Sequence, residues 1–383
     1  MIFVQMLLLI FMPGVKEFAN AEKADCSRAG RVYTWLTHMQ QPNGLVLSSE
    51  QGKNISLYDN ALAAIVYTAH GDFKRAEKIF NFFNSRLKSE MLVSPGGFAQ
   101  MRNLKGTAVD NRPRRWLGDN AWLLIALNNY HHYAKNTRYH KLAKVMTSWI
   151  VSLQDTDGGV WGGYDADGKR ISKIAEGNID AFNAVKGYTS FHQKLLAHFK
   201  QVRWDTKDEL LIAWADNPPY KYAMDLHPWG YCAFEDFPHD VLVKADRYLN
   251  TRLSTVTKMP VTGYCFDEDK DVVWLEGTAQ MAVAFLKAGK GEMAQKYLRE
   301  MDKCMIESLH YPGSIGLPYT TNFASSYADD VLWEGVDTCP AVSSTAWYLL
   351  ATIQFDPFRL EYRKNIPEVD KFWKKGTAEA GKK

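Results

Sequence analysis

The sequence predicts an all-α protein, a toroid of six helical hairpins of the (α/α)6 type. Three observations support this fold class. Segments with one polar and one apolar face alternate along the chain with segments that are apolar nearly all round. Six such pairs follow one another, and the connections within and between the pairs differ in length. A helix without a polar face has to be buried, so the second set is expected to lie inside a ring formed by the first.

The outer helices are recognised by their periodicity. In 73–87 the apolar residues Ala76, Ile79, Phe80 and Phe83 recur at helical spacing, while lysine and arginine occupy other positions. Each such segment has one face for water and one for the core. On this basis we expect outer helices at about 27–39, 73–87, 139–153, 192–215, 239–254 and 291–308.

The inner helices are recognised by unbroken apolar runs, such as 61–67 and 121–127. These runs are rich in Ala, Leu and Met, which favours helix over buried strand. The fourth contains Pro228 near its start and is the weakest of the set. We expect inner helices at about 58–70, 119–134, 176–190, 225–235, 276–289 and 343–355.

The connections indicate which face carries function. Inner-to-outer connections are short, as at His70-Gly71-Asp72, whereas 88–118, 154–175 and 309–342 are long and rich in Gly, Trp, Tyr and Asp. Long loops of this kind usually carry function. All of them lead into inner helices, so they should gather on one face of the ring. An open solenoid would also alternate, but at a tighter and more regular period.

Composition excludes some partners. The chain of 383 residues has 46 Lys and Arg against 43 Asp and Glu, a formal charge of +3. This near balance gives no electrostatic footprint for nucleic acid. The five cysteines have no CxxC spacing, so zinc is not indicated, and one or two disulfides stay open without a pairing. We expect no metal, no cofactor and a monomer.

The N-terminus predicts export. Residues 6–12 are apolar, Pro13-Gly14 follows, and Ala19-Asn20-Ala21 offers a cleavage site after Ala21. The run is too short to span a bilayer, which takes about 20 apolar residues. The first five residues carry no Lys or Arg, so an uncleaved anchor or a misassigned start stays an alternative. We expect a signal peptide at 1–21, a barrel domain at 22–361, a flexible tail at 362–383, a periplasmic or extracellular location and no membrane span after cleavage.

Carboxylates stand at the start of five of the six inner helices, including Asp225 in the fourth. Any one of them has a structural explanation, because Asp caps helices and Glu suits a first turn. Five on one rim, beside aromatic loops, point to acid–base chemistry. The candidate catalytic residues are Glu176, Asp180, Asp119, Glu276 and Asp59.

Glu176 and Asp180 are the most informative pair. Four residues apart, they share one helix face. Two like charges this close raise the pKa of one carboxyl unless a positive group such as Lys173 neutralises them. A carboxyl with a raised pKa suits a general acid, and an ionised partner suits a base or nucleophile.

Aromatic side chains beside carboxylates are typical of sugar sites, because a ring packs on the apolar face of a pyranose. In a helical toroid they can also simply fill space. The motifs Asp155-Thr156-Asp157-Gly158 and Asp165-Ala166-Asp167-Gly168 resemble calcium ligands but lack the full loop, so turns are expected there. The candidate substrate-binding residues are Trp116, Trp122, Trp161, Tyr164, Trp229, Trp274, Trp333, Tyr58, Asn60 and Asn120.

The chain resembles the six-hairpin glycosidase superfamily of bacterial (α/α)6 proteins over nearly its whole length after residue 21. The resemblance rests on the stretches 58–60, 118–122, 176–180 and 274–278. In that superfamily the catalytic acid and base are carboxylates at the mouth of the ring. The resemblance implies Glu176 as the general acid, with Asp59, Asp119 or Glu276 holding or activating the water.

The leading function is hydrolysis of a glycosidic bond in a polysaccharide or oligosaccharide. The same toroid also serves polysaccharide lyases, sugar epimerases and non-catalytic modules. A lyase or epimerase would need a Tyr or His base and, for uronates, a cation, for which His227, Tyr58 and Arg115 are available. The acidic mouth disfavours an anionic substrate. A carbohydrate-binding protein of the cell envelope is the third alternative.

Overall fold

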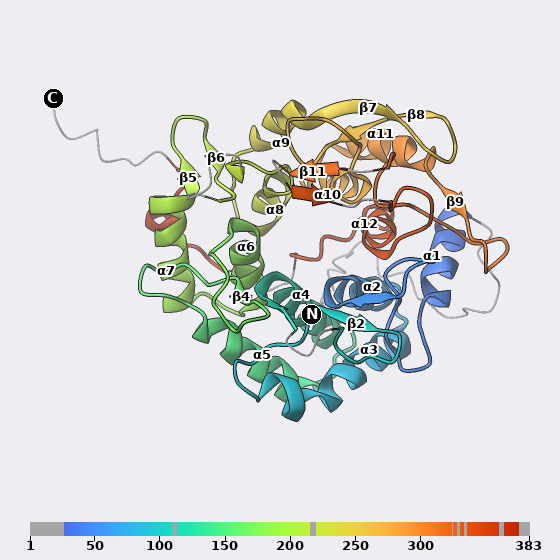
Figure 1. Ribbon diagram of the computed structural model, residues 1–383. Helices are drawn as coiled ribbons and strands as arrows, with labels where there is room; N and C mark the ends of the chain where they lie inside the picture. Colours follow the sequence, from blue (N-terminus) through green and yellow to red (C-terminus); the bar gives the residue numbers. More distant parts are fainter. Residues whose placement is uncertain are drawn as a thin grey trace, which may run out of the picture.

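The computed structural model describes residues 27–109, 113–214, 220–323, 325–327, 330–332, 335–359 and 364–374. Within these residues twelve α-helices form two concentric rings (Figure 1). The (α/α)6 toroid predicted from the sequence is confirmed. The outer ring contains α1 (Arg28–His38), α3 (Phe73–Ser85), α5 (His140–Ser152), α7 (Ser190–His198), α9 (Val241–Lys244) and α11 (Gly291–Asp302). The inner ring contains α2 (Leu57–Ala69), α4 (Leu117–Tyr133), α6 (Ala175–Ala184), α8 (Leu226–Ala233), α10 (Leu275–Lys287) and α12 (Val342–Thr352).

The inner ring is closed. Each inner helix packs on the next, and α12 packs on α2, so the last hairpin meets the first. An open solenoid would lack this last contact. The inner helices are buried nearly all round, as α4 is from Leu117 to Tyr130, which accounts for their lack of a polar face.

The short inner-to-outer turns follow the expected glycine chemistry. Gly71 after α2 and Gly289 after α10 have φ angles of 74° and 72°. Glycine adopts this left-handed conformation without steric cost, which ends a helix sharply. The next outer helix can therefore begin within a few residues.

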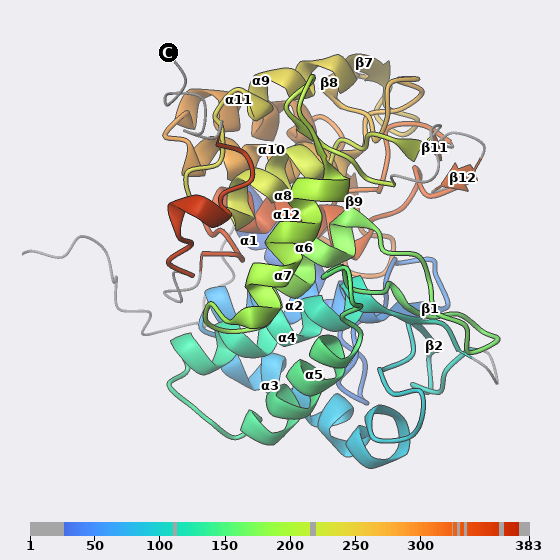
Figure 2. The same ribbon diagram turned by 90° about the vertical axis from the view of Figure 1, so that its left-hand side faces the viewer.

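The long outer-to-inner connections form small antiparallel sheets of two strands each. Figure 2 shows β1, β2, β11 and β12 on one face of the ring and the C-terminal segment on the opposite face. We call the first the near face and the second the far face. The two-stranded sheets are β1 (Asn54–Ser56) with β2 (Met101–Asn103), β3 (Arg115–Trp116) with β4 (Gly163–Tyr164), β5 (Trp204–Asp205) with β6 (Leu210–Leu211), β7 (Leu249–Leu253) with β8 (Pro260–Tyr264), β9 (Ile306–Glu307) with β10 (Ile315–Gly316) and β11 (Ser325–Tyr327) with β12 (Asp330–Leu332).

A repeated asparagine fixes these loops to the inner helices. Asn60 in α2 accepts a hydrogen bond from the backbone N–H of Val46 and donates one to the carbonyl of the same residue. Asn120 and Asn178 make the same pair of bonds with Phe98 and Val160. Each amide also donates to the carbonyl four residues before it.

In α10 and α12 a threonine takes the place of this asparagine. Thr278 Oγ1 accepts from the N–H of Tyr264, and Thr345 Oγ1 accepts from that of Leu317. All five side chains are fully buried. The repeats therefore share one device that holds each near-face loop against the helix it leads into.

Two outer helices are shorter than predicted. The segment expected at 192–215 leaves the α-helix after His198, continues as a π-helix (Phe199–Arg203), and then forms the β5–β6 hairpin. Asp205 stops the helix because its side chain accepts from the backbone N–H groups of Lys207 and Asp208, closing a turn. The segment expected at 239–254 is α9 and a 3₁₀ turn (Ala245–Tyr248), followed by strand β7.

Part of the segment expected as a flexible tail packs on the core. Phe372 and Trp373 are buried, and their rings lie against Phe234 and Phe237. A 3₁₀ turn (Glu368–Asp370) precedes them. Tail residues 362–363 and 375–383 lie outside the described residues.

The expected signal peptide at 1–21 also lies outside the described residues. Among the helices that are described, none is long and apolar enough to cross a bilayer. The four cysteines of the described residues, Cys232, Cys265, Cys304 and Cys339, are buried and free, so none of them forms a disulfide with another.

Candidate active site

The structure brings the predicted carboxylates together on the near face. All six inner helices begin there, and each carboxylate belongs to the first turns of its helix. The sixth helix, α12, presents Ser343 and Ser344 instead. The carboxylates are Asp59 on α2, Asp119 on α4, Glu176 and Asp180 on α6, Asp225 at the N-cap of α8 and Glu276 on α10.

Capping does not explain the carboxylates of α2, α4, α6 and α10. The N-cap of α2 is Ser56, whose hydroxyl accepts from the N–H of Asp59. The N-caps of α4, α6 and α10 are Trp116, Ile174 and Trp274, and no side chain caps these helices. These carboxylates, at the second or third residue of their helices, are therefore available to interact with a ligand.

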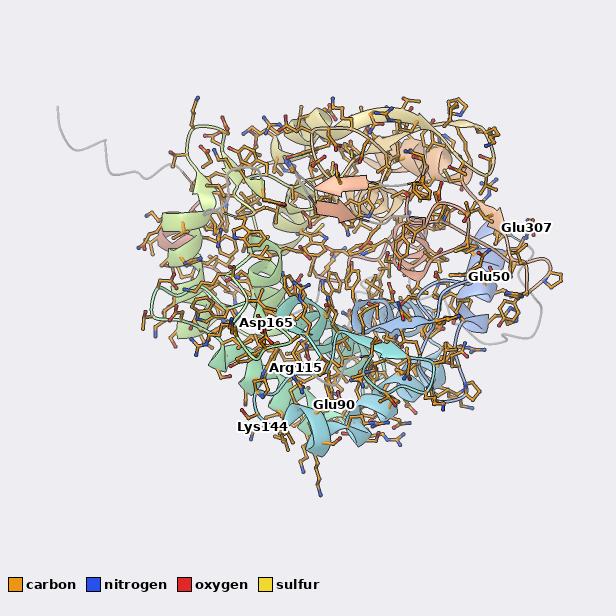
Figure 3. All side chains as sticks on the ribbon, in the orientation of Figure 1. Glu50, Glu90, Arg115, Lys144, Asp165 and Glu307 are labelled. Carbon is orange, nitrogen blue, oxygen red and sulfur yellow. The ribbon has the colours of Figure 1, made fainter. Side chains whose placement is uncertain are left out.

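Burial separates one carboxylate from the rest. Five of the six carboxylates are buried, from 0 % exposed at Asp180 to 8 % exposed at Asp119, whereas Glu176 is only partly buried. Side chains occupy the space that the ribbon leaves open in the middle of the ring (Figure 3). A substrate arriving from the near face would therefore meet Glu176 first.

Two tyrosines hold carboxylates in place. Tyr58 donates to Glu276 Oε1 at 2.6 Å, and its own oxygen accepts from the indole N–H of Trp347 at 2.9 Å. Gln280, one turn further along α10, donates to the same Glu276 oxygen. Tyr319, in the loop before α12, lies 3.4 Å from Asp59 Oδ2.

Burial keeps several of these groups protonated near neutral pH. Burial raises the pKa of Asp59 to about 7, and hydrogen bonds from Ser48 and Tyr319 oppose it. Burial, with the charges of Glu176 and Asp59, raises the pKa of Asp119 to about 8. Ionisation of one carboxyl group thus disfavours ionisation of the carboxyl groups near it.

Glu176 interacts electrostatically with carboxylates of other inner helices. Burial and the Glu276 carboxylate raise its pKa to about 7, and the Arg114 guanidinium opposes the rise. Burial, followed by the charge of Glu176, also raises the pKa of Asp180 and of Asp225 well above the usual range. Within this group, ionisation of one carboxyl favours protonation of its neighbour.

The inner helices supply an opposing field. All six direct their N-termini at the near face, and each N-terminus carries about half a positive charge from the aligned peptide dipoles. This field favours the ionised form of first-turn carboxylates. It explains how one rim can hold six of them with so few cations.

The cations near this face are engaged differently from expectation. Lys173 does not neutralise Glu176 and Asp180, because its ammonium pairs with Asp155 at 2.6 Å and Asp157 at 2.8 Å. The Arg115 guanidinium donates to the carbonyl of Gly97. The cation that acts on Asp119 and Glu176 is Arg114, which sequence reasoning missed.

Asn60 and Asn120 were predicted to bind substrate, and in the structure both side chains bond to the backbone of the near-face loops. Both side chains are 0 % exposed, and their amide groups form hydrogen bonds with backbone groups of the loops. In the sequence, an asparagine that follows a candidate catalytic Asp looks the same whether its side chain binds a ligand or holds a loop in place. The recurrence of asparagine as the fourth residue of three inner helices, at Asn60, Asn120 and Asn178, was the signal for the structural role.

The candidate aromatic residues divide into two groups. Trp122 and Trp229 lie inside the barrel, where the Trp122 ring contacts the rings of Tyr58, Trp229, Trp347 and Phe358 at 5.1–5.6 Å. These rings pack beneath the carboxylates and support them.

The other aromatic candidates belong to the near-face loops. The Arg114 guanidinium lies 3.9 Å from the centre of the Trp116 ring, and Lys173 lies 4.6 Å from that of Trp161, so one face of each indole is covered. Trp274 is buried against Phe266, and Tyr164 is partly buried in β4. Trp333 lies outside the described residues.

The histidine considered as a base lies away from the carboxylates. His227 Nδ1 bonds to the carbonyl of Val241 at 2.8 Å, and its ring packs on Tyr248. Burial lowers its pKa to about 4. Its partners belong to α9 and the turn after it, so it serves the contact between α8 and that outer element.

One group among the described residues has the spacing of a metal site, Cys265 with Asp267 and Asp269. Its members are used to tie loops together. Cys265 Sγ contacts Asp269 and Asp271, and Ser326 donates through its hydroxyl to Asp269 and through its backbone N–H to Asp271. These bonds hold the β11–β12 hairpin over the near face.

Comparison with known proteins identifies the fold. No family model matches the chain, and a comparison with curated proteins gave no significant match. Solved structures do match over most of their length. A glycosidase variant in complex with glucose gives a TM-score of 0.59 at 12 % identity, covering 88 % of this chain and 99 % of that one.

Two further matches are sugar-converting enzymes. Cellobiose 2-epimerase from Bacillus thermoamylovorans gives a TM-score of 0.56 at 12 % identity, covering 84 % of this chain and 95 % of that one. A D-mannose isomerase gives 0.57 at 12 %, covering 88 % and 99 %. At this identity the likeness concerns the fold, and the chain has the (α/α)6 barrel architecture of enzymes that process sugars.

Proposed function

We propose that the chain is a glycoside hydrolase that cleaves a polysaccharide or oligosaccharide with a pair of carboxyl groups on the near face. The observation that carries the proposal is the state of Glu176. It is the one carboxylate of the six that is partly exposed, and its pKa is raised to about 7. A general acid must reach the leaving oxygen and be protonated at working pH, and Glu176 meets both conditions.

The second carboxyl group comes from the adjacent helix. Asp225 lies at the N-cap of α8, which packs on α6. Burial and the charge of Glu176 raise its pKa, and the backbone N–H of Leu226 opposes this rise. Its Oδ1 has no hydrogen-bond partner among the described residues. We propose that this pair carries one proton at working pH, which Glu176 holds as the acid while Asp225 is ionised and activates water as the base.

The remaining carboxylates would position the sugar. A carboxyl group accepts hydrogen bonds from hydroxyl groups when ionised and can also donate one when protonated, and Asp59, Asp119 and Glu276 lie in the first turns of other inner helices. Arg114 is placed to keep part of the cluster ionised.

Hydrolysis is better supported than the alternatives. An epimerase or lyase that removes a proton from carbon needs a free Tyr or His base, and His227 is turned away while Tyr58 is bonded to Glu276. A uronate would meet six carboxylates, and Arg115 is bonded to a loop carbonyl. The near face therefore suits a neutral sugar.

The proposal is tested by incubating the protein with neutral and uronic-acid polysaccharides. New reducing ends, the ultraviolet absorbance of unsaturated products and the monosaccharide composition are followed together. We expect reducing ends without absorbance and without conversion of one sugar to another. Absorbance rising in step would indicate a lyase, and a changed sugar without new ends would indicate an epimerase.

The same assay is repeated with Glu176→Gln, which we expect to lose 100-fold or more of kcat, on the order of a lost general acid. Glu307→Gln is the matched control, since Glu307 lies at the outer edge of the ring, where it pairs with Arg31 (Figure 3). Full activity of Glu176→Gln would show that another group is the acid.

We also propose that the protein is exported, on the strength of the apolar segment 6–12 and the Ala19-Asn20-Ala21 triplet. Mass spectrometry of the protein recovered outside the cytoplasm should give a mature chain that begins at Glu22. An intact N-terminus on the recovered protein would contradict cleavage at this point.

A further inference from the structure

A large cavity lies on the far face of the ring. It encloses about 1110 Å³. Its walls are the C-terminal ends of α4, α6, α8 and α10 and the segment that follows α12. It opens on the side opposite the carboxylates, where Figure 2 shows the C-terminal segment. Its size is at the upper end of small-molecule sites, which are roughly 300–1,000 Å³.

Aromatic rings line this far cavity. Tyr133, at the end of α4, is 43 % exposed, and its ring centre lies 5.5 Å from that of Phe355 and 4.7 Å from that of His132. Phe358 also lines the cavity. An exposed tyrosine beside a second ring provides an apolar surface bordered by polar groups.

The charged groups of the far cavity are largely satisfied by the protein. Lys287 donates to the last carbonyls of α8, at Tyr231 and Cys232. Lys364 donates to the carbonyl that follows α6, at Val185. Both ammonium groups thus compensate the negative ends of inner helices. A ligand would meet hydrogen-bonding groups of both signs without a strong excess of either.

Asp356 gives the cavity a fixed polar group. Its Oδ1 accepts from the backbone N–H of Phe358 at 2.9 Å, which sets the plane of the carboxyl. Its Oδ2 has no hydrogen-bond partner among the described residues. Asn183 and Gln354 add amides to the same lining.

We propose that the far cavity is a second, non-catalytic binding site for a neutral oligosaccharide. Tyr133 and Phe355 would pack on the apolar faces of sugar rings, and the surrounding amides and carboxyl would take the hydroxyl groups. A neutral polyhydroxylated ligand fits because it needs many hydrogen bonds and no countercharge. The inference does not depend on the hydrolase proposal, since binding on the far face involves none of the near-face carboxylates.

The test is isothermal titration of the full-length protein with neutral tetrasaccharides of glucose, mannose and N-acetylglucosamine. The variants are Tyr133→Ala and Asp356→Asn. Tyr311→Ala is the control, because Tyr311 is a partly buried tyrosine that packs on His38 and does not line the far cavity. Thermal unfolding of each variant verifies that it folds.

We expect at least one tetrasaccharide to bind the wild type, and Tyr133→Ala to weaken that binding tenfold or more. Asp356→Asn should weaken it several-fold, and Tyr311→Ala should leave it unchanged. Hydrolysis of a short soluble substrate should not change in Tyr133→Ala. Unchanged affinity of folded Tyr133→Ala and Asp356→Asn, or no binding by the wild type, would overturn the inference. Tyr133-dependent binding by a protein without glycosidase activity would uphold it and refute only the hydrolase proposal.

Discussion

The near and far faces of the ring are built from the same six inner helices and carry opposite chemistry. The near face receives the helix N-termini and holds six carboxylates. The far face receives the C-termini, and Lys287 and Lys364 donate to the exposed carbonyls there. Because all inner helices run in one direction, their dipoles add, and each face accepts the charge that its dipole ends favour. The polarity of the barrel thus decides where acid–base chemistry can be placed.

The largest effect is expected from Asp225, which the sequence analysis placed on the rim but left out of the catalytic set. Asp225→Asn should lower kcat/KM by about 10²–10⁴-fold, because the variant cannot accept a proton from water. Initial rates on the substrate found by the polysaccharide panel measure this. Asp240→Asn is the control, since Asp240 is an exposed ion-pair partner of Lys244 on α9. A loss of less than tenfold in Asp225→Asn would assign the base to another carboxylate.

The next effect tests how the near-face loops are held. Asn120→Ala removes three hydrogen bonds to buried backbone groups. We expect the free energy of unfolding to fall by about 2–4 kcal/mol, at about 1 kcal/mol for each bond. Urea unfolding measures it, with Asn136→Ala in an exposed turn as the control. Loss of activity without loss of stability would indicate instead that Asn120 binds the substrate.

The third prediction concerns pH. Folding raises the pKa of Asp119 to about 8, so the native state binds a proton more tightly than the unfolded state. Stability from this group is fully present below its unfolded pKa of about 4 and is lost as pH rises through about 8. The melting temperature of the wild type should therefore fall from pH 4 to pH 8, and Asp119→Asn should fall less steeply. An equal slope in both proteins would show that Asp119 does not titrate in this range.

The smallest effect is expected on the far face. Lys287→Met removes the ammonium that bonds to Tyr231 and Cys232 at the end of α8. Because Lys287 is exposed, the loss of stability should be only about 0.3–1 kcal/mol, and salt should reduce it. Thermal unfolding at low and high salt measures this loss of stability. Lys290→Met, at an exposed lysine, is the control. A loss that salt does not change would point to packing of the side chain as the cause.

The sequence predicted the architecture well because burial leaves a local pattern. Apolar runs identified every inner helix, including α8 with Pro228, and the position of a carboxylate at a helix start was enough to place it on the near face. Helix ends were less predictable. The pattern of residues 239–254 predicts a continuous helix, but only α9 and a 3₁₀ turn form, because the rest of the segment pairs as β7 with β8.

The partners of individual side chains could not be predicted. Lys173 was near Glu176 in sequence but bonds to Asp155 and Asp157 across a loop. Arg114 and Arg115 are neighbours with different surroundings, and only the folded chain separates them. Long-range contacts of this kind leave no periodic trace.

Phe358 gives the molecule an unexpected weak point. Its ring packs on Trp122 and Trp229, beneath the carboxylates, and also lines the far cavity. A single side chain from the segment after α12 therefore connects the aromatic rings beneath the carboxylates with the wall of the far cavity. Proteolysis after residue 352 would remove Phe358 together with the buried Phe372 and Trp373. Loss of the C-terminal segment would therefore disturb packing at the centre of the barrel.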